Sequence, residues 1–139
     1  MQPKFLSIFL LTIFILTNFT ANAVNVNDEI DGRIGKYPST IRYSLNPNNG
    51  TVTGEFYINS IYAPISGLIK LNGTAKHISD PEIPHYPLYK VKMKATTSAG
   101  KVCGNWNVLI DTRMGTVEGT CTINGYSYNV SFDSNEGYR

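Results

Sequence analysis

Two histidines and two carboxylates fall within one short segment, "KHISDPEIPHYP", residues 76–87. Imidazole and carboxylate groups bind divalent metals and transfer protons in general acid–base catalysis. Their spacing matches no zinc-binding pattern, and Pro81, Pro84 and Pro87 favour a stiff, extended backbone. We therefore predict no metal and no cofactor here. The segment is either a plain connector or a binding loop, whose candidate contact residues are His77, Asp80, Glu82, His85 and Tyr86.

A row of lysines follows this segment. In "YKVKMKA" every second residue is a lysine, so Lys90, Lys92 and Lys94 share one outward face of a predicted strand. Such a row is a candidate surface for an anionic partner. The interpretation we favour from sequence is edge protection, because lysines on an exposed edge strand discourage sheet-to-sheet aggregation. Nucleic acid is not predicted as a partner, since no outward aromatic residues interleave with these lysines.

Nothing in the chain predicts nucleophilic catalysis. No Gly-x-Ser-x-Gly sequence is present, and Cys121 falls on an inward position between apolar residues, as an inert structural thiol does. No glycine-rich loop opens a helix to hold a phosphate. We name no catalytic residue, and an enzymatic function is the weakest of the hypotheses considered below.

The strands that position these residues are visible as period-two alternation, while helical spacing is nearly absent. Seven segments separated by turn residues predict strands; they are residues 40–45, 51–58, 63–73, 89–95, 102–110, 116–123 and 126–132. Part of residues 24–30 is an optional eighth strand. Short connections favour an antiparallel meander. The prediction is one all-β domain of seven or eight strands that forms a small barrel or flattened sandwich. Its inward positions include Ile65, Gly67, Trp106, Tyr126 and Phe132.

The last two hairpins allow a register to be predicted. Asn124–Gly125 favours a two-residue turn with positive φ at both positions, which pairs Ile123 with Tyr126 and Cys121 with Tyr128. In the hairpin before it, matching inward faces pairs Val108 with Val117, Trp106 with Gly119 and Gly104 with Cys121. A bulge at Cys103–Gly104 then turns Cys103 inward.

That register brings the two cysteines together. We predict a disulfide between Cys103 and Cys121, because it suits an exported protein in an oxidising compartment. In the chain-entropy model it contributes about 3 kcal/mol.

The beginning of the chain predicts export. Lys4 precedes the apolar run "FLSIFLLTIFILTNF", and Ala21, Asn22 and Ala23 form a small-x-small cleavage site. Residues 1–23 are therefore predicted to be a cleaved signal peptide, and residues 24–139 the all-β domain, without a transmembrane anchor. Without Lys4 the domain has 11 basic and 10 acidic side chains, a balance that predicts no general affinity for nucleic acid or anionic membranes.

Three functions from different classes fit these features. The first is a periplasmic or secreted binding protein or inhibitor, whose partner is a protein or a glycan. It would use loops at one barrel end, formed by "HISDPEIPHYP" and "TTSAGK" (residues 96–101). The second is a structural or adhesive subunit that joins neighbours through strand edges. The third is a small hydrolase that uses residues 76–87. The sequence predicts neither the partner nor the oligomeric state.

Overall fold

A computed structural model of the chain describes residues 25–79, 82 and 87–134. The predicted signal peptide, residues 1–23, lies outside this range. Eight strands make up the fold: β1 (Val26–Ile34), β2 (Tyr37–Asn46), β3 (Thr51–Ile58), β4 (Ile69–His77), β5 (Leu88–Thr96), β6 (Val102–Asp111), β7 (Thr116–Ile123) and β8 (Tyr126–Asp133). Among the described residues, no helix is long and apolar enough to cross a membrane.

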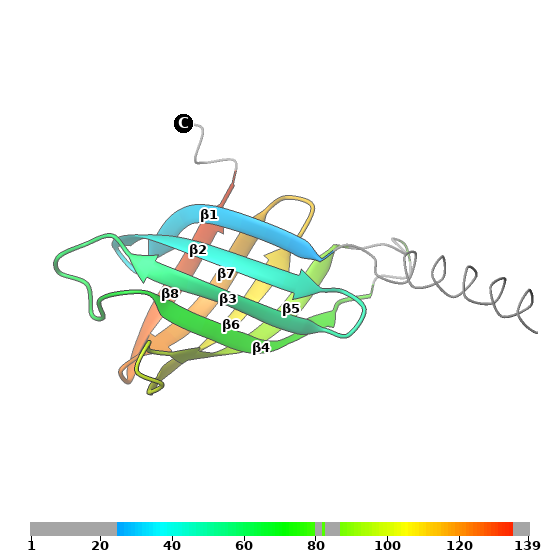
Figure 1. The fold of residues 1–139 in the computed structure, drawn as a ribbon. Coiled ribbons are helices and arrows are strands. Elements are labelled where there is room, and N and C mark those ends of the chain that lie inside the picture. Colours follow the sequence, from blue (N-terminus) through cyan, green and yellow to red (C-terminus); the bar gives the residue numbers. More distant parts are fainter. Residues whose placement is uncertain (1–24, 80–81, 83–86, 135–139) are drawn as a thin grey trace, which may run out of the picture.

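The strands form a closed antiparallel barrel (Figure 1). Each strand pairs with its neighbour in the sequence, and β8 pairs with β1. The predicted meander and the optional eighth strand are both confirmed, and the fold is a barrel rather than a sandwich. The closing ladder is short, since it joins only Gly32–Ile34 to Val130–Phe132.

Successive strands run in opposite directions, so their connections alternate between the two ends of the barrel. The β1–β2 end carries residues 35–36, 59–68, 97–101 and 124–125. The β2–β3 end carries the connections 47–50 and 112–115, and the described residues 78, 79 and 87 next to β4 and β5. His77 and Leu88, which flank most of the 76–87 segment, therefore lie at the opposite end of the barrel from residues 97–101. This placement argues against one binding face made of both loops, which stays a prediction because residues 80–81 and 83–86 lie outside the described chain.

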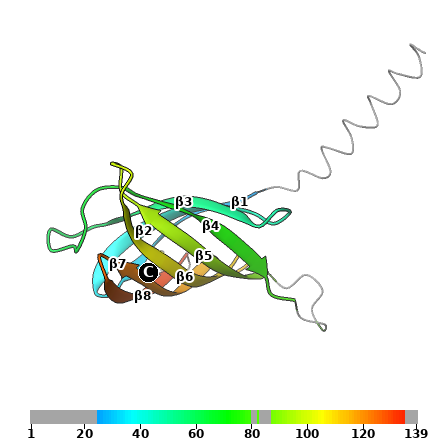
Figure 2. The ribbon, with the colours of Figure 1, turned by 90° about the horizontal axis from the view of Figure 1, so that it is seen from below.

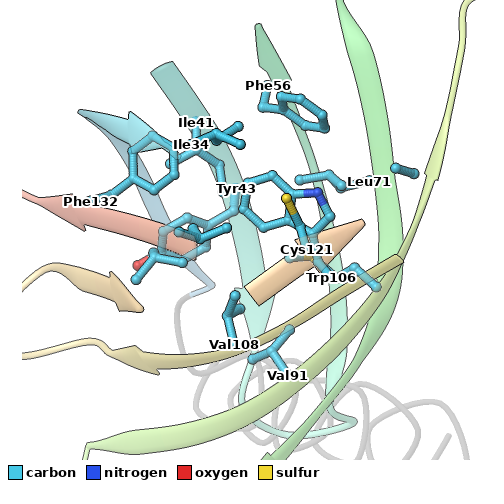
Figure 3. Close-up of a cluster of buried hydrophobic side chains, with 14 of the residues drawn as sticks. Ile34, Ile41, Tyr43, Phe56, Leu71, Val91, Trp106, Val108, Cys121 and Phe132 are labelled. Atoms are coloured by element: carbon cyan, nitrogen blue, oxygen red, sulfur yellow. The ribbon is translucent and has the colours of Figure 1, made fainter. Parts of the chain in front are cut away.

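Apolar side chains fill the interior of the barrel (Figure 3). Trp106, Phe56 and Phe132 are its largest fully buried residues. The Trp106 ring centroid lies 4.9 Å from that of Phe56 and 6.2 Å from that of Phe132. The prediction that Trp106 and Phe132 point inward is confirmed. These rings occupy the space that a hollow barrel would offer to a ligand.

The terminal hairpin has the predicted register. Ile123 pairs with Tyr126 and Cys121 with Tyr128, and φ is positive at Asn124 (50°) and Gly125 (88°). Tyr126 departs from its predicted inward position and is 71% exposed. The reason is that β1 covers β8 only at Val130–Phe132, so the beginning of β8 lies beyond the closing ladder.

The hairpin from β6 to β7 is displaced by two residues from the predicted register. Trp106 pairs with Cys121, and Ile110 with Val117. The Asp111 side chain accepts hydrogen bonds of 3.0 Å from the backbone N–H groups of Arg113 and Met114. These bonds stabilise a four-residue turn, residues 112–115, where the predicted pairing requires two residues. A shift of two keeps every inward side chain inward, so alternation alone does not distinguish the two registers.

The predicted disulfide is absent, and both cysteines are free and buried. A bulge does occur at Cys103, because Ala95 pairs with Gly104 and Thr96 with Val102. The Cys103 carbonyl accepts a 2.8 Å hydrogen bond from the Asn124 N–H. Asn124 lies three residues beyond Cys121, which is about 10 Å along a strand, and a disulfide tolerates a Cα separation of at most about 7 Å.

The start of the fourth strand also differs from the prediction. β4 begins at Ile69, so Ile65 and Gly67 belong to the loop 59–68 rather than to a strand. Gly67 has a φ of 83°, which interrupts an extended strand. At its other end β4 continues to His77, so Lys76 and His77 are strand residues and not part of a loop.

Candidate functional site

The lysine row lies on a central strand of the barrel. Lys90, Lys92 and Lys94 are exposed on the outer face of β5, as predicted. However, β5 pairs with β4 along one side and with β6 along the other. Edge protection requires a strand with an unpaired side. The interpretation favoured from sequence is therefore wrong, and the row needs another explanation.

The neighbouring strands extend this row into a basic surface. On β4, Lys76 lies directly opposite Lys90, and Asn72 opposite Lys94. On β6, Asn107 pairs with Lys92 and Asn105 with Lys94. Figure 2 shows the three strands side by side. We call this surface the basic wall; it consists of Lys70, Lys76, Lys90, Lys92, Lys94, Asn72, Asn105 and Asn107, all exposed.

Four of the five lysines of the basic wall, all except Lys70, have no carboxylate opposite them in the described ladders. β4 and β5 contain no aspartate or glutamate. The ion pairs found among the described residues both belong to Arg42 on β2, which contacts Glu29 at 3.3 Å and Glu55 at 3.1 Å. The hydrogen bond that Arg42 donates to the Glu55 carboxylate, and then the charge of Glu29, raise the pKa of Arg42. Carboxylates thus accompany the cation on β1–β3, and Glu55 also lies opposite Lys70 of the basic wall. For Lys76, Lys90, Lys92 and Lys94, no ion pair is found within the described residues.

A surface hollow of about 400 Å³ lies within the basic wall. Its lining includes two lysines and three asparagines beside Met93 and Trp106: Lys92, Lys94, Asn72, Asn105 and Asn107. The ammonium groups donate hydrogen bonds and carry charge, while each carboxamide both donates and accepts. This combination suits a ligand that has anionic groups together with hydroxyls.

The predicted loop residues are only partly within the described structure. His77 ends β4 and packs on Tyr89, with ring centroids 5.2 Å apart. Glu82 is exposed. Asp80, His85 and Tyr86 lie outside the described residues, so the proposed loop face stays a prediction. In the described part of the chain no three histidine, cysteine or acidic side chains gather as a metal site would require.

The two thiols are placed in the apolar interior. Burial raises the pKa of the Cys121 thiol from 9.0 to about 12, and burial also raises that of Cys103. A thiol of raised pKa is protonated at neutral pH and reacts slowly, since the thiolate is the nucleophile. This environment agrees with the sequence-based interpretation of Cys121 as a structural residue.

Sequence reasoning found three residues of the basic wall and missed the others. Lys70, Asn72 and Lys76 recur at even spacing in "IKLNGTAKH", a signal of one outward face that the misplaced strand start concealed. Asn105 and Asn107 alternate around Trp106 in the same way. Their convergence on Lys92 and Lys94 depends on strand pairing, which no local pattern reveals.

Comparison with known proteins adds no relative to this picture. The chain matches no protein-family model, no curated protein and no solved structure.

Proposed function

We propose that this protein is an exported, non-catalytic binding protein, and that its basic wall binds an acidic glycan. The observation that carries the proposal is the lysine row on a doubly paired strand. Lys76 and Lys90 lie directly opposite each other, and like charges in that position destabilise a sheet. A natural protein retains like charges that lower its stability where those charges are needed for function.

The chemistry of the hollow favours a glycan that carries carboxylate or sulfate groups. Lys92 and Lys94 are spaced to meet anionic substituents, and the three asparagines suit sugar hydroxyls. At an exposed surface each lysine–anion pair contributes about 0.2–1 kcal/mol. A polymer with many anionic groups contacts several lysines of the basic wall at once, and these contributions combine to give measurable affinity. An acidic protein surface is the alternative partner, as for an inhibitor, and it would use the same lysines.

The other functions have less support. Assembly through strand edges has less support, because β8 pairs with β1 and only the parts of these two strands outside the closing ladder have an unpaired side. The hydrolase hypothesis depends on His77, Asp80, Glu82 or His85. Asp80 and His85 lie outside the described residues, so this hypothesis stays a prediction.

The test uses residues 24–139, since all eight strands and the core lie within residues 25–134. Binding to polygalacturonate and to dextran sulfate is measured by calorimetry, with neutral dextran for comparison. The variant Lys92→Gln/Lys94→Gln should lose affinity by about tenfold, because two lysine–anion pairs are removed. Rising salt should weaken binding of the parent.

The control is Lys36→Gln/Lys101→Gln, which removes the same charge from the β1–β2 end. It should bind the acidic glycans nearly as well as the parent. Equal losses in both variants would show that net charge alone attracts the polymer. No binding to either acidic polymer would reject the glycan proposal.

A further inference from the structure

The β1–β2 end of the barrel presents apolar side chains to solvent. Ile61 and Tyr62 are 92% and 78% exposed, and Tyr126 is 71% exposed. Leu68 and Val102 are exposed at the same end. We propose that this end, separate from the basic wall, docks the protein on an anionic lipid surface. The inference goes beyond the glycan binding proposed above.

The loop 59–68 is built to display its apolar tip. The Ala63 N–H donates a 3.2 Å hydrogen bond to the Ser60 carbonyl, and the Tyr62 N–H donates one of 3.1 Å to the Ser60 hydroxyl. These bonds close a turn with Ile61 and Tyr62 at its two central positions. Such positions usually hold glycine, proline, asparagine or aspartate. Figure 1 shows this loop projecting from the left side of the barrel.

The base of the loop is fixed to the barrel. The Asn59 N–H donates a 2.7 Å hydrogen bond to the Pro38 carbonyl, and Ile65 packs against the core. The tip, Ile61 and Tyr62, is therefore held away from the core, whereas Ile65 in the same loop packs against the core. Exposed apolar side chains on an anchored, projecting turn indicate a contact surface rather than incomplete folding.

The charge at this end selects the partner. Its four connections, residues 35–36, 59–68, 97–101 and 124–125, contain Lys36 and Lys101 and no aspartate or glutamate. Basic residues next to exposed apolar ones match an anionic bilayer, where lysines meet phosphates and the apolar tip enters the interface. Tyrosine is enriched at that depth. A second copy of this chain fits less well, because Lys36 and Lys101 would face their own counterparts.

The experiment measures partition of residues 24–139, so that the apolar run at the start of the chain is absent. Vesicles of phosphatidylcholine mixed with phosphatidylglycerol are compared with pure phosphatidylcholine by sedimentation. The parent should bind the anionic vesicles. Ile61→Ser/Tyr62→Ser should lower the partition coefficient by about tenfold or more, since two inserted side chains are lost. Met114→Ser, a matched change in a turn at the β2–β3 end, should leave it unchanged.

Two double lysine substitutions distinguish this proposal from glycan binding. Lys36→Gln/Lys101→Gln should weaken vesicle binding more than Lys92→Gln/Lys94→Gln does, the reverse of the order expected for acidic glycans. In a Tyr62→Trp variant, emission should shift to the blue on binding anionic vesicles. Absence of vesicle binding, or equal binding by Ile61→Ser/Tyr62→Ser and the parent, would overturn the proposal. Self-association of the parent that the Ile61→Ser change abolishes would also overturn it, in favour of a dimer.

Discussion

Trp106 on β6 lies directly opposite Cys121 on β7, so the residue that faces this cysteine across the ladder is a tryptophan rather than a second cysteine. This pairing decides the state of both thiols and the composition of the barrel interior. Because the two cysteines are free, the disulfide that was predicted from export into an oxidising compartment is not formed. The prediction of export itself depends on the apolar run and the cleavage site.

The first prediction concerns the thiols. The melting temperature of residues 24–139 should be the same with and without a reductant, because no disulfide is present to be reduced. Thiol titration should find two free thiols after denaturation and almost none before it, since both are buried. Cys103→Ser should change the melting temperature equally in both buffers. Selective destabilisation by the reductant would show that a disulfide forms.

The second prediction concerns the core. Trp106→Ala should lower the free energy of unfolding by about 3–5 kcal/mol, as large-to-small changes at buried aromatic positions do. Trp106→Phe should cost less, because the Trp106 Nε1 has no hydrogen-bond partner in the described structure and its removal breaks no bond. Urea denaturation gives both values. Tyr126→Ala, at an exposed position, is the control and should change stability by about 0.5 kcal/mol or less. A small effect of Trp106→Ala would mean that the ring is not part of the core.

The third prediction concerns alkaline pH. The folded state holds the pKa of Cys121 at about 12, against 9.0 for an ordinary thiol. Between these values the unfolded chain releases the proton and the folded chain keeps it, so rising pH favours unfolding. Stability should be complete below about pH 9 and fall by up to about 1.4 kcal/mol per pH unit above it. Tyr43, whose pKa is raised mainly by burial, acts in the same direction at higher pH.

Urea denaturation at about pH 8 and about pH 10 checks this dependence. Cys121→Ala should be less stable than the parent at the lower pH, because it leaves a cavity. It should then lose about 1 kcal/mol less on the change to the higher pH. An alkaline loss as large in Cys121→Ala as in the parent would exclude Cys121 as its source.

The fourth prediction concerns the like-charge pair on the basic wall. Lys76→Glu should raise the free energy of unfolding by about 0.2–1 kcal/mol, because an opposite charge then lies across from Lys90. Added salt should stabilise the parent more than the variant, since it screens repulsion in one and attraction in the other. Lys76→Gln should be intermediate. Destabilisation by Lys76→Glu would show that Lys76 makes a favourable contact that outweighs the repulsion.

The strands themselves were predictable because each has a buried and an exposed face. Alternation identified the inward positions of Trp106 and Phe132, and Asn124–Gly125 set the last hairpin through its need for positive φ. The start of β4 was not predictable in this way. Ile65 and Ile69 have the same spacing as inward strand residues, and only the backbone of Gly67 separates them into loop and strand.

The sequence by itself therefore determined the all-β meander, most of its inward residues and the outward lysine row. The tertiary structure decided which strands lie beside the lysine row and in which register neighbouring strands pair. A register shift of two preserves every face, so alternation left Cys103 and Cys121 within apparent reach, and the four-residue turn at Asp111 separated them. Pairing with both β4 and β6 made β5 a central strand, and the register between β4 and β5 set Lys76 against Lys90. Contacts between strands depend on pairing across the sheet, which the local spacing of residues along one strand does not encode.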